Sequence, residues 1–230
     1  MAPSLSIIVP VRDEAEVIGP ALLRLAPLRA LGAEVIVVDG GSRDDTVDRC
    51  TAAADLVLQA PAGRARQMNA GAARARGRQL LFLHADTRLP LDAAAVLAQA
   101  LAPGPAPGGH LWGRFDVRIE GRSRWLPMVA ALMNRRSRWT GIATGDQALF
   151  MRRDVFQAVG GFPDQALMED IELSRRLKRL GPPACRREQV ITSGRRWDSR
   201  GAWRTILLMW RLRWLYWIGV SPERLARAYR

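Results

Sequence analysis

The chain has 230 residues, of which 48% are hydrophobic, so it can bury one sizeable core within a single domain. Two cysteines without a Cys/His cluster exclude a disulfide framework and a structural zinc site. The formal net charge of +13 favours anionic ligands, but no zinc-finger, RNA-recognition or basic-zipper signature is present, so we expect no nucleic-acid binding.

Apolar runs alternate with helical patterns in the N-terminal half. Strands are predicted at 4–10, 33–39, 55–59 and 79–84, and helices at 14–32, 42–53, 63–77 and 91–101. Ser42 is the predicted N-cap of the second helix. This alternation indicates the α/β class, with a doubly wound, mostly parallel sheet of Rossmann-like type.

A Pro/Gly-rich linker is predicted at 102–109, and the pattern changes after it. The sequence then predicts a strand at 110–121, a helix at 122–138, a strand, helix and tight turn within 145–163, and a helix at 168–181. The last helix begins with acids and ends with bases, as the helix dipole favours.

Polar clusters follow three of the predicted strands. Residues 10–14 follow the first strand, 39–42 the second and 84–87 the fourth. Because ligands of open α/β sheets bind beyond the carboxyl ends of the strands, the three clusters are expected at one edge. That edge is the predicted binding site.

Asp86 is the predicted metal ligand. A hard divalent cation, Mg²⁺ or Mn²⁺, needs few protein ligands when a diphosphate supplies further oxygens. His84 is a second candidate ligand, or it orients Asp86 or the substrate. The alternative is that both residues only cap a loop.

Asp39 and Arg64 are candidates for nucleotide contacts. The Asp39 carboxylate could accept hydrogen bonds from a ribose or a base, or it could form an Asx-turn instead. A dinucleotide fold is disfavoured, since G-x-G-x-x-G does not follow the first strand. Arg64 opens the helix at 63–77, where the helix N-terminus also attracts phosphate, although it could equally be solvated.

Glu169 and Asp170 begin the helix at 168–181. One of them could be a general base for an acceptor hydroxyl, or both could simply complement the helix dipole. Arg196 and Trp197 lie in the basic stretch 193–204, which could close over a diphosphate or form a surface loop near a membrane.

These stretches together resemble the family 2 glycosyltransferases of the GT-A fold. The resemblance is carried in chain order by SIIVPVRDE, VIVVDGGSRDDT, GRARQMNAGAARARG, LLFLHADT and GDQALFMRRDVFQAVGGFPDQALMEDIELSRRL. His84 stands where the family has the first Asp of its D-x-D motif, and Ser193 replaces Gln in Q-x-x-R-W. The HADT motif is most similar to a small bacterial subgroup of this family.

The resemblance implies a role for each motif residue. Pro10 and Glu14 would line the nucleotide pocket, Asp39 would bind the base, Arg64 would contact the nucleotide, Asp86 would bind the metal and Asp170 would be the base. Glu169, Arg196 and Trp197 would lie on the acceptor or leaving-group side. The implied reaction is an inverting, metal-dependent displacement with a nucleotide-sugar donor, a UDP-sugar in first place.

The resemblance also implies a domain organisation. A glycosyltransferase domain is expected at 1–200, with a nucleotide-sugar-binding half at 1–101 and an acceptor half at 110–200. Amphipathic helices are expected at 201–230. Two alternatives stay open, namely a nucleotidyltransferase and a membrane-associated nucleotide-binding protein without turnover.

The stretch at 202–220 is rich in Trp and Leu, but three arginines interrupt it. A membrane-spanning helix is therefore not expected, whereas an interfacial helix on an anionic leaflet is. The alternatives are a helix packed on the domain and a dimer contact. The start of the chain lacks signal-peptide features, so we expect a cytoplasmic protein, peripheral at the inner face of the plasma membrane, where a lipid-linked acceptor would be within reach.

Overall fold

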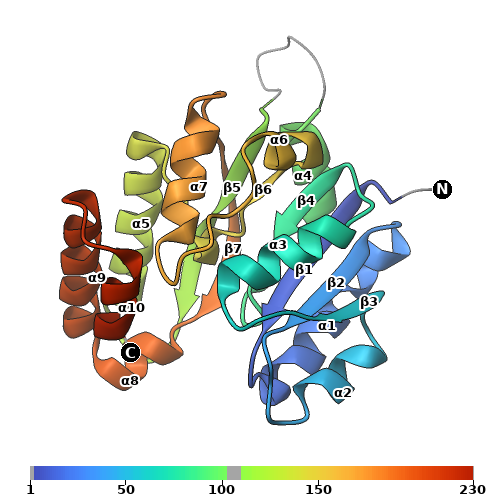
Figure 1. Ribbon diagram of the computed structural model, residues 1–230, viewed down its shortest axis with the longest axis horizontal. Helices are drawn as coiled ribbons and strands as arrows, with labels where there is room; N and C mark the ends of the chain where they lie inside the picture. Colours follow the sequence, from blue (N-terminus) through green and yellow to red (C-terminus); the bar gives the residue numbers. More distant parts are fainter. Residues whose placement is uncertain (1–2, 103–109, 230) are drawn as a thin grey trace.

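The computed structural model describes residues 3–102 and 110–229, so most of the predicted 102–109 linker lies outside the described residues (Figure 1). The described residues form a seven-stranded sheet in the order β3-β2-β1-β4-β6-β5-β7. The strands are β1 Leu5–Val11, β2 Glu34–Asp39, β3 Leu56–Gln59, β4 Gln79–Phe82, β5 Trp112–Glu120, β6 Phe150–Arg152 and β7 Ala184–Ser193. Only β6 runs antiparallel to its neighbours, which confirms the predicted mostly parallel sheet.

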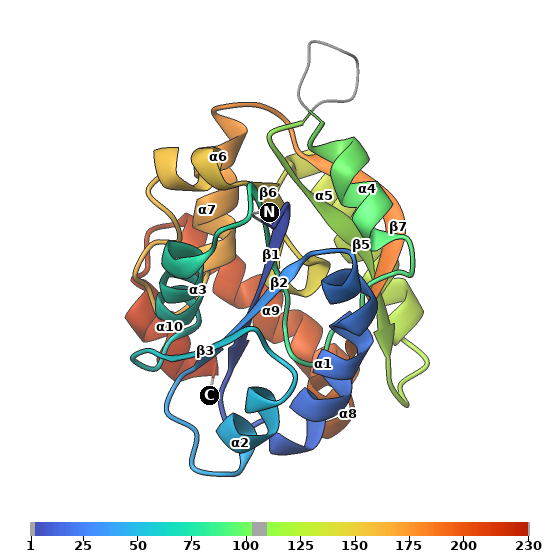
Figure 2. The same cartoon turned by 90° about the vertical axis from the view of Figure 1, so that its right-hand side faces the viewer.

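Helices cover both faces of this sheet, with α3, α6 and α7 on one side and α1 and α4 on the other (Figure 2). Their bounds are α1 Ala15–Ala30, α2 Thr46–Thr51, α3 Arg64–Arg74, α4 Ala93–Ala100, α5 Leu126–Thr140, α6 Arg153–Ala158 and α7 Glu169–Lys178, with a 3-10 turn, η1, at Gly145–Gln147. Three helices follow β7, namely α8 Arg195–Arg200, α9 Ala202–Trp217 and α10 Pro222–Tyr229.

The alternation of side chains along β1 builds two cores. Ile7 and Val9 point into the core that contains α1 and α4, whereas Ile8 points into the core under α3, α6 and α7. Successive residues of a strand face opposite sides of the sheet, so a strand buried on both faces reads as a continuous apolar run. This explains why the central strands could be predicted from sequence.

The structure differs from expectation at three places. Ser42 does not cap a helix, because α2 begins at Thr46 with Asp45 as its N-cap residue, and the Ser42 hydroxyl donates instead to Asp39. No strand was expected at 184–193, yet β7 pairs there with β5 at the edge of the sheet. Part of the stretch at 193–204 forms α8 rather than a loop.

Close packing fixes the start of α3 next to the turn that precedes α7. Gly71 lies so near β1 that a Cβ there would be 2.6 Å from the Ile8 side chain. The Asn69 amide donates to the Phe162 carbonyl at 2.8 Å and accepts from the Phe162 N–H at 2.9 Å. Gly71 and Asn69 therefore serve packing, and they hold α3 against β1 and against the turn that precedes α7.

Candidate functional site

One cavity of about 920 Å³ opens beyond the carboxyl ends of β1, β4 and β7, between α3, α5, α7 and α9. Its volume is in the range that ligand pockets usually have. Nine of the ten predicted site residues line it, and they come from separate parts of the chain. They are Pro10, Glu14, Arg64, His84, Asp86, Glu169, Asp170, Arg196 and Trp197.

Asp39 is the predicted site residue that does not line this cavity. Its side chain is buried, and its carboxylate accepts hydrogen bonds from the Gly41 N–H at 3.0 Å and the Ser42 hydroxyl at 2.5 Å. These bonds match the Asx-turn alternative. The predicted contact between Asp39 and a nucleotide base stays a prediction.

Asp170 lies at the first turn of α7 and faces the cavity. Its carboxylate accepts the N–H of Gly145 at 2.9 Å and that of Ile171 at 2.7 Å. Burial, together with the neighbouring charge of Glu169, raises the pKa of Asp170 from 3.8 to about 6. A carboxylate with this pKa is ionised at neutral pH and yet basic enough to take a proton.

Arg64 begins α3, and its guanidinium lies 3.5 Å from the Glu169 carboxylate. Burial alone would lower the pKa of Arg64, but four nearby carboxylates more than compensate and raise it. They belong to Glu169, Asp146, Asp170 and Asp86. An arginine at a helix N-terminus is a suitable partner for a diphosphate.

Asp146 in η1 is a site residue that the sequence analysis missed. It lines the cavity, and its carboxylate lies 3.4 Å from Nδ1 of His84. Burial would raise the pKa of Asp146, but His84 and the charges of Arg64 and Arg196 lower it overall. The other edge of the His84 ring faces Gly145, where a Cβ would lie 2.7 Å from Nε2. The geometry therefore places His84 as the partner of Asp146.

The residues around Asp86 fit a metal only when a substrate completes its coordination. The Asp86 carboxylate lies 3.7 Å from Arg195, which also donates to Glu14 at 3.2 Å. Among residues 3–102 and 110–229, no group of three or more His, Cys, Asp or Glu side chains could hold a metal. Because Mg²⁺ accepts one carboxylate plus phosphate oxygens and water, Asp86 with a bound diphosphate is an adequate donor set.

The last strand and α8 bring Arg196 and Trp197 to the same cavity. The Arg196 guanidinium stacks over the Tyr229 ring at 4.2 Å, which ties α8 to α10. Trp197 packs on the core that contains α1. The prediction that these two residues serve the acceptor or leaving group stays a prediction.

Arg136 is a second residue that the sequence analysis missed. It lies on α5 and lines the cavity, and its Nε and Nη2 atoms are buried without a hydrogen-bond partner among the described residues. The motif around it carried no signal, because α5 reads as an ordinary helix with several arginines. Only the packing of α5 against the rest of the fold brings Arg136 into the site.

Comparison with known proteins gives a family match and one curated relative. The model of Glycosyl transferase family 2 matches residues 6–160, which is more than half of the chain. An undecaprenyl-phosphate 4-deoxy-4-formamido-L-arabinose transferase of Pseudomonas paraeruginosa is 31% identical over 159 residues. The match covers 64% of this chain and 45% of that protein, so the chain matches less than half of the relative's length.

Solved structures with a similar fold include enzymes crystallised with nucleotides. A mannosyltransferase of Pyrobaculum calidifontis, in complex with GDP-Man and Mn²⁺, aligns with a TM-score of 0.68 at 21% identity, over 100% of this chain and 69% of that chain. Glucosyl-3-phosphoglycerate synthase of Mycobacterium tuberculosis, with Mg²⁺ and UDP, aligns with a TM-score of 0.60 at 23% identity, over 83% and 70%. Likeness at this level of identity shows the fold alone.

Proposed function

The chain belongs to glycosyl transferase family 2 and has its GT-A fold, and we propose that it transfers a sugar from a nucleotide-sugar donor to an acceptor hydroxyl. The observation that carries this proposal is the gathering of nine predicted site residues around one cavity. They come from the end of β1, from the loops after β1 and β4, from the starts of α3 and α7, and from α8.

The proposed reaction is a single direct displacement. Asp170 takes the proton of the acceptor hydroxyl, the freed oxygen forms a bond to the anomeric carbon, and the bond from that carbon to the diphosphate breaks. Attack from the face opposite the leaving group inverts the anomeric configuration. The raised pKa of Asp170, about 6, supports its role as the base.

Cationic groups of the cavity stabilise the leaving nucleoside diphosphate. Arg64 lies among the site carboxylates, and Arg196 is close enough to influence Asp146. Asp86 would hold a divalent cation, Mg²⁺ or Mn²⁺, which when bound offsets the charge of the diphosphate. His84 fixes the carboxylate of Asp146 at the edge of this group.

We assign the donor as a UDP-sugar in first place and a GDP-sugar in second. The solved relatives carry UDP or GDP-Man together with Mg²⁺ or Mn²⁺, which supports both the nucleotide class and the metal. The curated relative is named for undecaprenyl phosphate, which supports a lipid-linked acceptor. The assignments of donor, metal and acceptor each rest on similarity to these proteins and on the residues that line the cavity.

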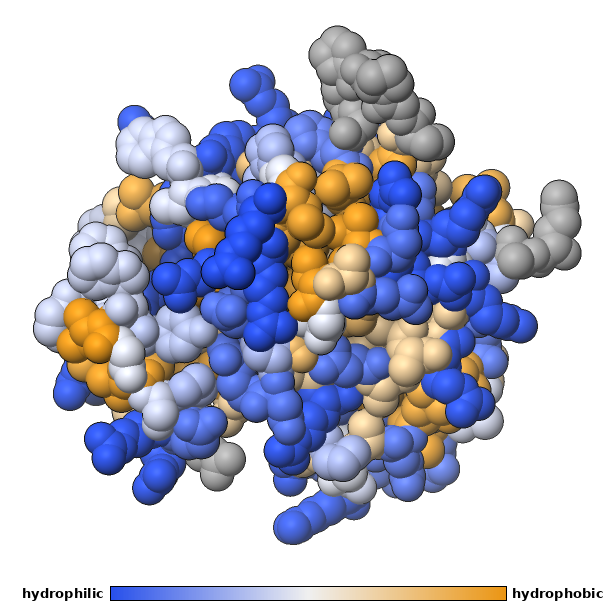
Figure 3. Space-filling view, turned by 45° about the horizontal axis from the view of Figure 1, so that its top comes forward, coloured by the Kyte–Doolittle hydropathy of each residue, from blue (hydrophilic) through white to orange (hydrophobic). Residues whose placement is uncertain are grey.

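We also propose peripheral membrane contact, which α9 would make. One stripe of this helix, spaced by four and three residues, is exposed and apolar: Trp203, Leu207, Trp210, Trp214 and Trp217. Figure 3 shows apolar side chains reaching the surface at the left edge, where α9 lies in Figure 1. Within residues 3–102 and 110–229 no helix has the length and hydropathy to cross a bilayer.

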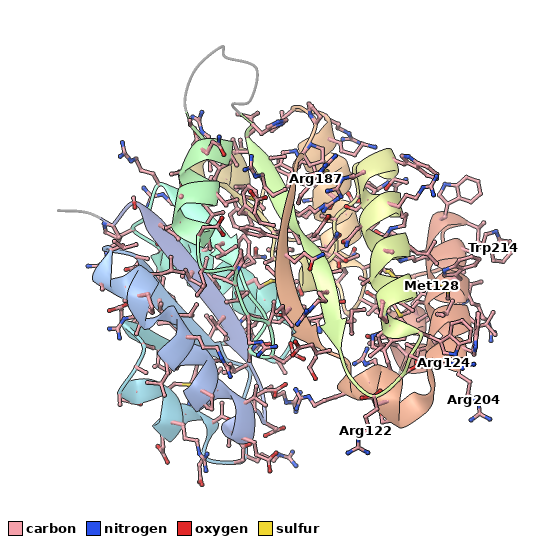
Figure 4. All side chains as sticks on the ribbon, turned by 180° about the vertical axis from the view of Figure 1, so that it is seen from behind. Arg122, Arg124, Met128, Arg187, Arg204 and Trp214 are labelled. Carbon is pink, nitrogen blue, oxygen red and sulfur yellow. The ribbon has the colours of Figure 1, made fainter. Side chains whose placement is uncertain are left out.

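The opposite side of α9 packs on the domain, as the alternative hypothesis proposed. Leu212 of α9 and Leu225 of α10 form a buried cluster with Met168, directly before α7. Arg204 and Trp214 project outward from α9 and Met128 from α5, on one side of the molecule (Figure 4). Arginine beside exposed Trp is the composition that favours an anionic membrane surface.

A binding and turnover panel tests the proposed function. UDP-, GDP- and dTDP-sugars are added with and without Mn²⁺ or Mg²⁺, and both the thermal midpoint and the release of nucleoside diphosphate are measured. A nucleotide at about 100 times its dissociation constant stabilises the fold by roughly 2.7 kcal/mol. With one nucleotide class we expect a rise in the thermal midpoint and slow release of the nucleoside diphosphate. A folded protein that shows neither would contradict the proposal and favour the non-catalytic alternative.

The nucleotidyltransferase alternative predicts a different product. Such an enzyme would release pyrophosphate from a nucleoside triphosphate, whereas a glycosyltransferase releases the nucleoside diphosphate from a sugar donor. The family match favours the second reaction. Pyrophosphate release by the wild-type protein would contradict this choice.

A further inference from the structure

Arg136 is a charged group of the cavity that has no role in the proposed reaction. Two other arginines of α5 have partners. The guanidinium of Arg135 stacks over the Trp139 ring at 4.4 Å, and that of Arg138 donates to both carboxylate oxygens of Asp116, at 2.6 and 2.9 Å. Arg136 itself has two buried nitrogens, Nε and Nη2, that find no acceptor among the described residues. Buried guanidinium nitrogens without an acceptor are costly, which indicates that a ligand supplies the acceptor.

A second arginine faces the same space from the neighbouring helix. Arg213 of α9 lines the cavity, and its Nε atom is likewise buried without a partner among the described residues. Figures 1 and 4 both show α9 beside α5. Two guanidinium groups offer several N–H donors with the geometry that phosphate oxygens accept. Burial lowers the pKa of Arg136, and the charges of Asp170 and Asp146 only partly compensate.

The wall around these arginines is apolar and leads to the surface. Val129 and Met133 of α5 and Ile206 and Met209 of α9 line the cavity. Three further lining side chains are also exposed to solvent by half or more: Leu132, Trp139 and Trp210. Trp210 belongs to the exposed stripe of α9, so the apolar wall is continuous with the proposed membrane-facing surface.

We infer that the α5–α9 side of the cavity is the acceptor subsite, and that Arg136, with Arg213, binds a phosphate group carried by an apolar chain. The acceptor is then an anionic amphiphile whose hydroxyl reaches Asp170 while its chain leaves along Trp210 toward the surface. Arg136 lies within electrostatic reach of Asp170, so an anion bound there places the acceptor beside the base. This inference rests on the proposed function and names the acceptor class of the same site.

Octyl phosphate, below its micelle concentration, is the probe. Calorimetric titration is expected to show saturable binding of one molecule per chain to the wild-type protein. Hydrogen bonds to charged groups are worth enough that Arg136→Gln should weaken binding by roughly 10- to 100-fold. Arg175→Gln removes the same charge from an exposed position of α7 outside the cavity, and its affinity should equal that of the wild type.

Two further ligands separate the phosphate from the chain without any variant. Octanol lacks the anion and inorganic phosphate lacks the chain, and each should bind the wild-type protein at least roughly 10-fold more weakly than octyl phosphate. Equal binding of octanol would overturn the role of the arginines. Equal binding of inorganic phosphate would overturn the amphiphile, and unchanged affinity in a folded Arg136→Gln variant would overturn the assignment of that residue.

A nucleotide-sugar thermal shift distinguishes a failure of the acceptor-site inference from a failure of the proposed function. Arg136→Gln should keep the thermal shift that a nucleotide sugar with Mn²⁺ produces in the wild-type protein, since Arg136 lies outside the predicted donor residues. Loss of that thermal shift in the variant would indicate that Arg136 binds the nucleotide-sugar donor, and it would overturn the inference. A wild-type protein that binds octyl phosphate but no nucleotide sugar would overturn the proposed function instead.

Discussion

Replacing Asp170 by Asn should make the protein more stable and nearly inactive. The pKa of this carboxyl rises from 3.8 to about 6 in the fold, chiefly because burial and the Glu169 charge disfavour its ionised form. Each pKa unit corresponds to about 1.4 kcal/mol, so the ionised carboxylate costs the folded state roughly 3 kcal/mol. Asn removes that charge and keeps one oxygen for the Gly145 N–H, but, like the protonated carboxyl, it gives up the second acceptor, which receives the Ile171 N–H in the wild type.

The sign of the pH dependence follows from the direction of the shift. Below the unfolded pKa of 3.8 the carboxyl is neutral in both states, and wild type and variant should be equally stable. Between pH 3.8 and about 6 the wild-type protein loses stability relative to the variant, and above that range the difference stays constant. For a chain of this size, roughly 3 kcal/mol corresponds to a rise of about 6–12 °C in the melting temperature at pH 8.

The assay is a set of thermal unfolding scans of both proteins from pH 4 to pH 8, with donor turnover measured in parallel. Loss of a general base should reduce turnover by about 10²–10⁴. Glu172→Gln, on the same helix, is the control, and should change stability by no more than about 0.5 kcal/mol at any pH in the range. A variant less stable at pH 8, or a difference independent of pH, would refute the account of Asp170; unchanged turnover would refute its role as the base.

Two further predictions concern packing and membrane contact. Gly145→Ala puts a Cβ 2.7 Å from the His84 ring and should lower stability by about 1–3 kcal/mol and reduce turnover. Gly19→Ala, inside α1 directly before Pro20 and with no other packed neighbour within 4 Å, should change stability by no more than about 0.5 kcal/mol, and calorimetry that gave equal losses for both variants would contradict this interpretation. Trp214→Ser with Trp217→Ser should weaken co-sedimentation with anionic liposomes by at least roughly 10-fold, while Leu23→Ser, equally exposed on α1, should not; equal binding by all three proteins would exclude α9 as the contact.

The parts of the fold that sequence could predict are those with a strong local pattern. The β1 and β2 strands are buried on both faces and read as apolar runs, and α7 carries its own acid-to-base polarity. The β7 strand was missed because it lies at the sheet edge and carries Arg186, Arg187 and Glu188 on a half-exposed surface. Its place depends on pairing with β5, which no local pattern records.

The candidate site divides in the same way. Residues directly after a strand, such as Glu14 and Asp86, could be placed at one edge because parallel strands end together. Asp146 and Arg136 could not, since a 3-10 turn and an arginine-rich helix reach the cavity only through tertiary packing. The local bonds of Asp39 were an open alternative in the sequence, and the structure contains them.

Calorimetric titration of UDP and GDP, with and without Mn²⁺, into the wild-type protein and Asp86→Ala tests the central claim most directly. The account predicts that one nucleotide binds the wild-type protein, that Mn²⁺ tightens this binding, and that Asp86→Ala removes the effect of Mn²⁺. Absence of nucleotide binding to the folded wild-type protein, or an equal effect of Mn²⁺ in both proteins, would contradict a metal-assisted nucleotide-sugar site at this cavity.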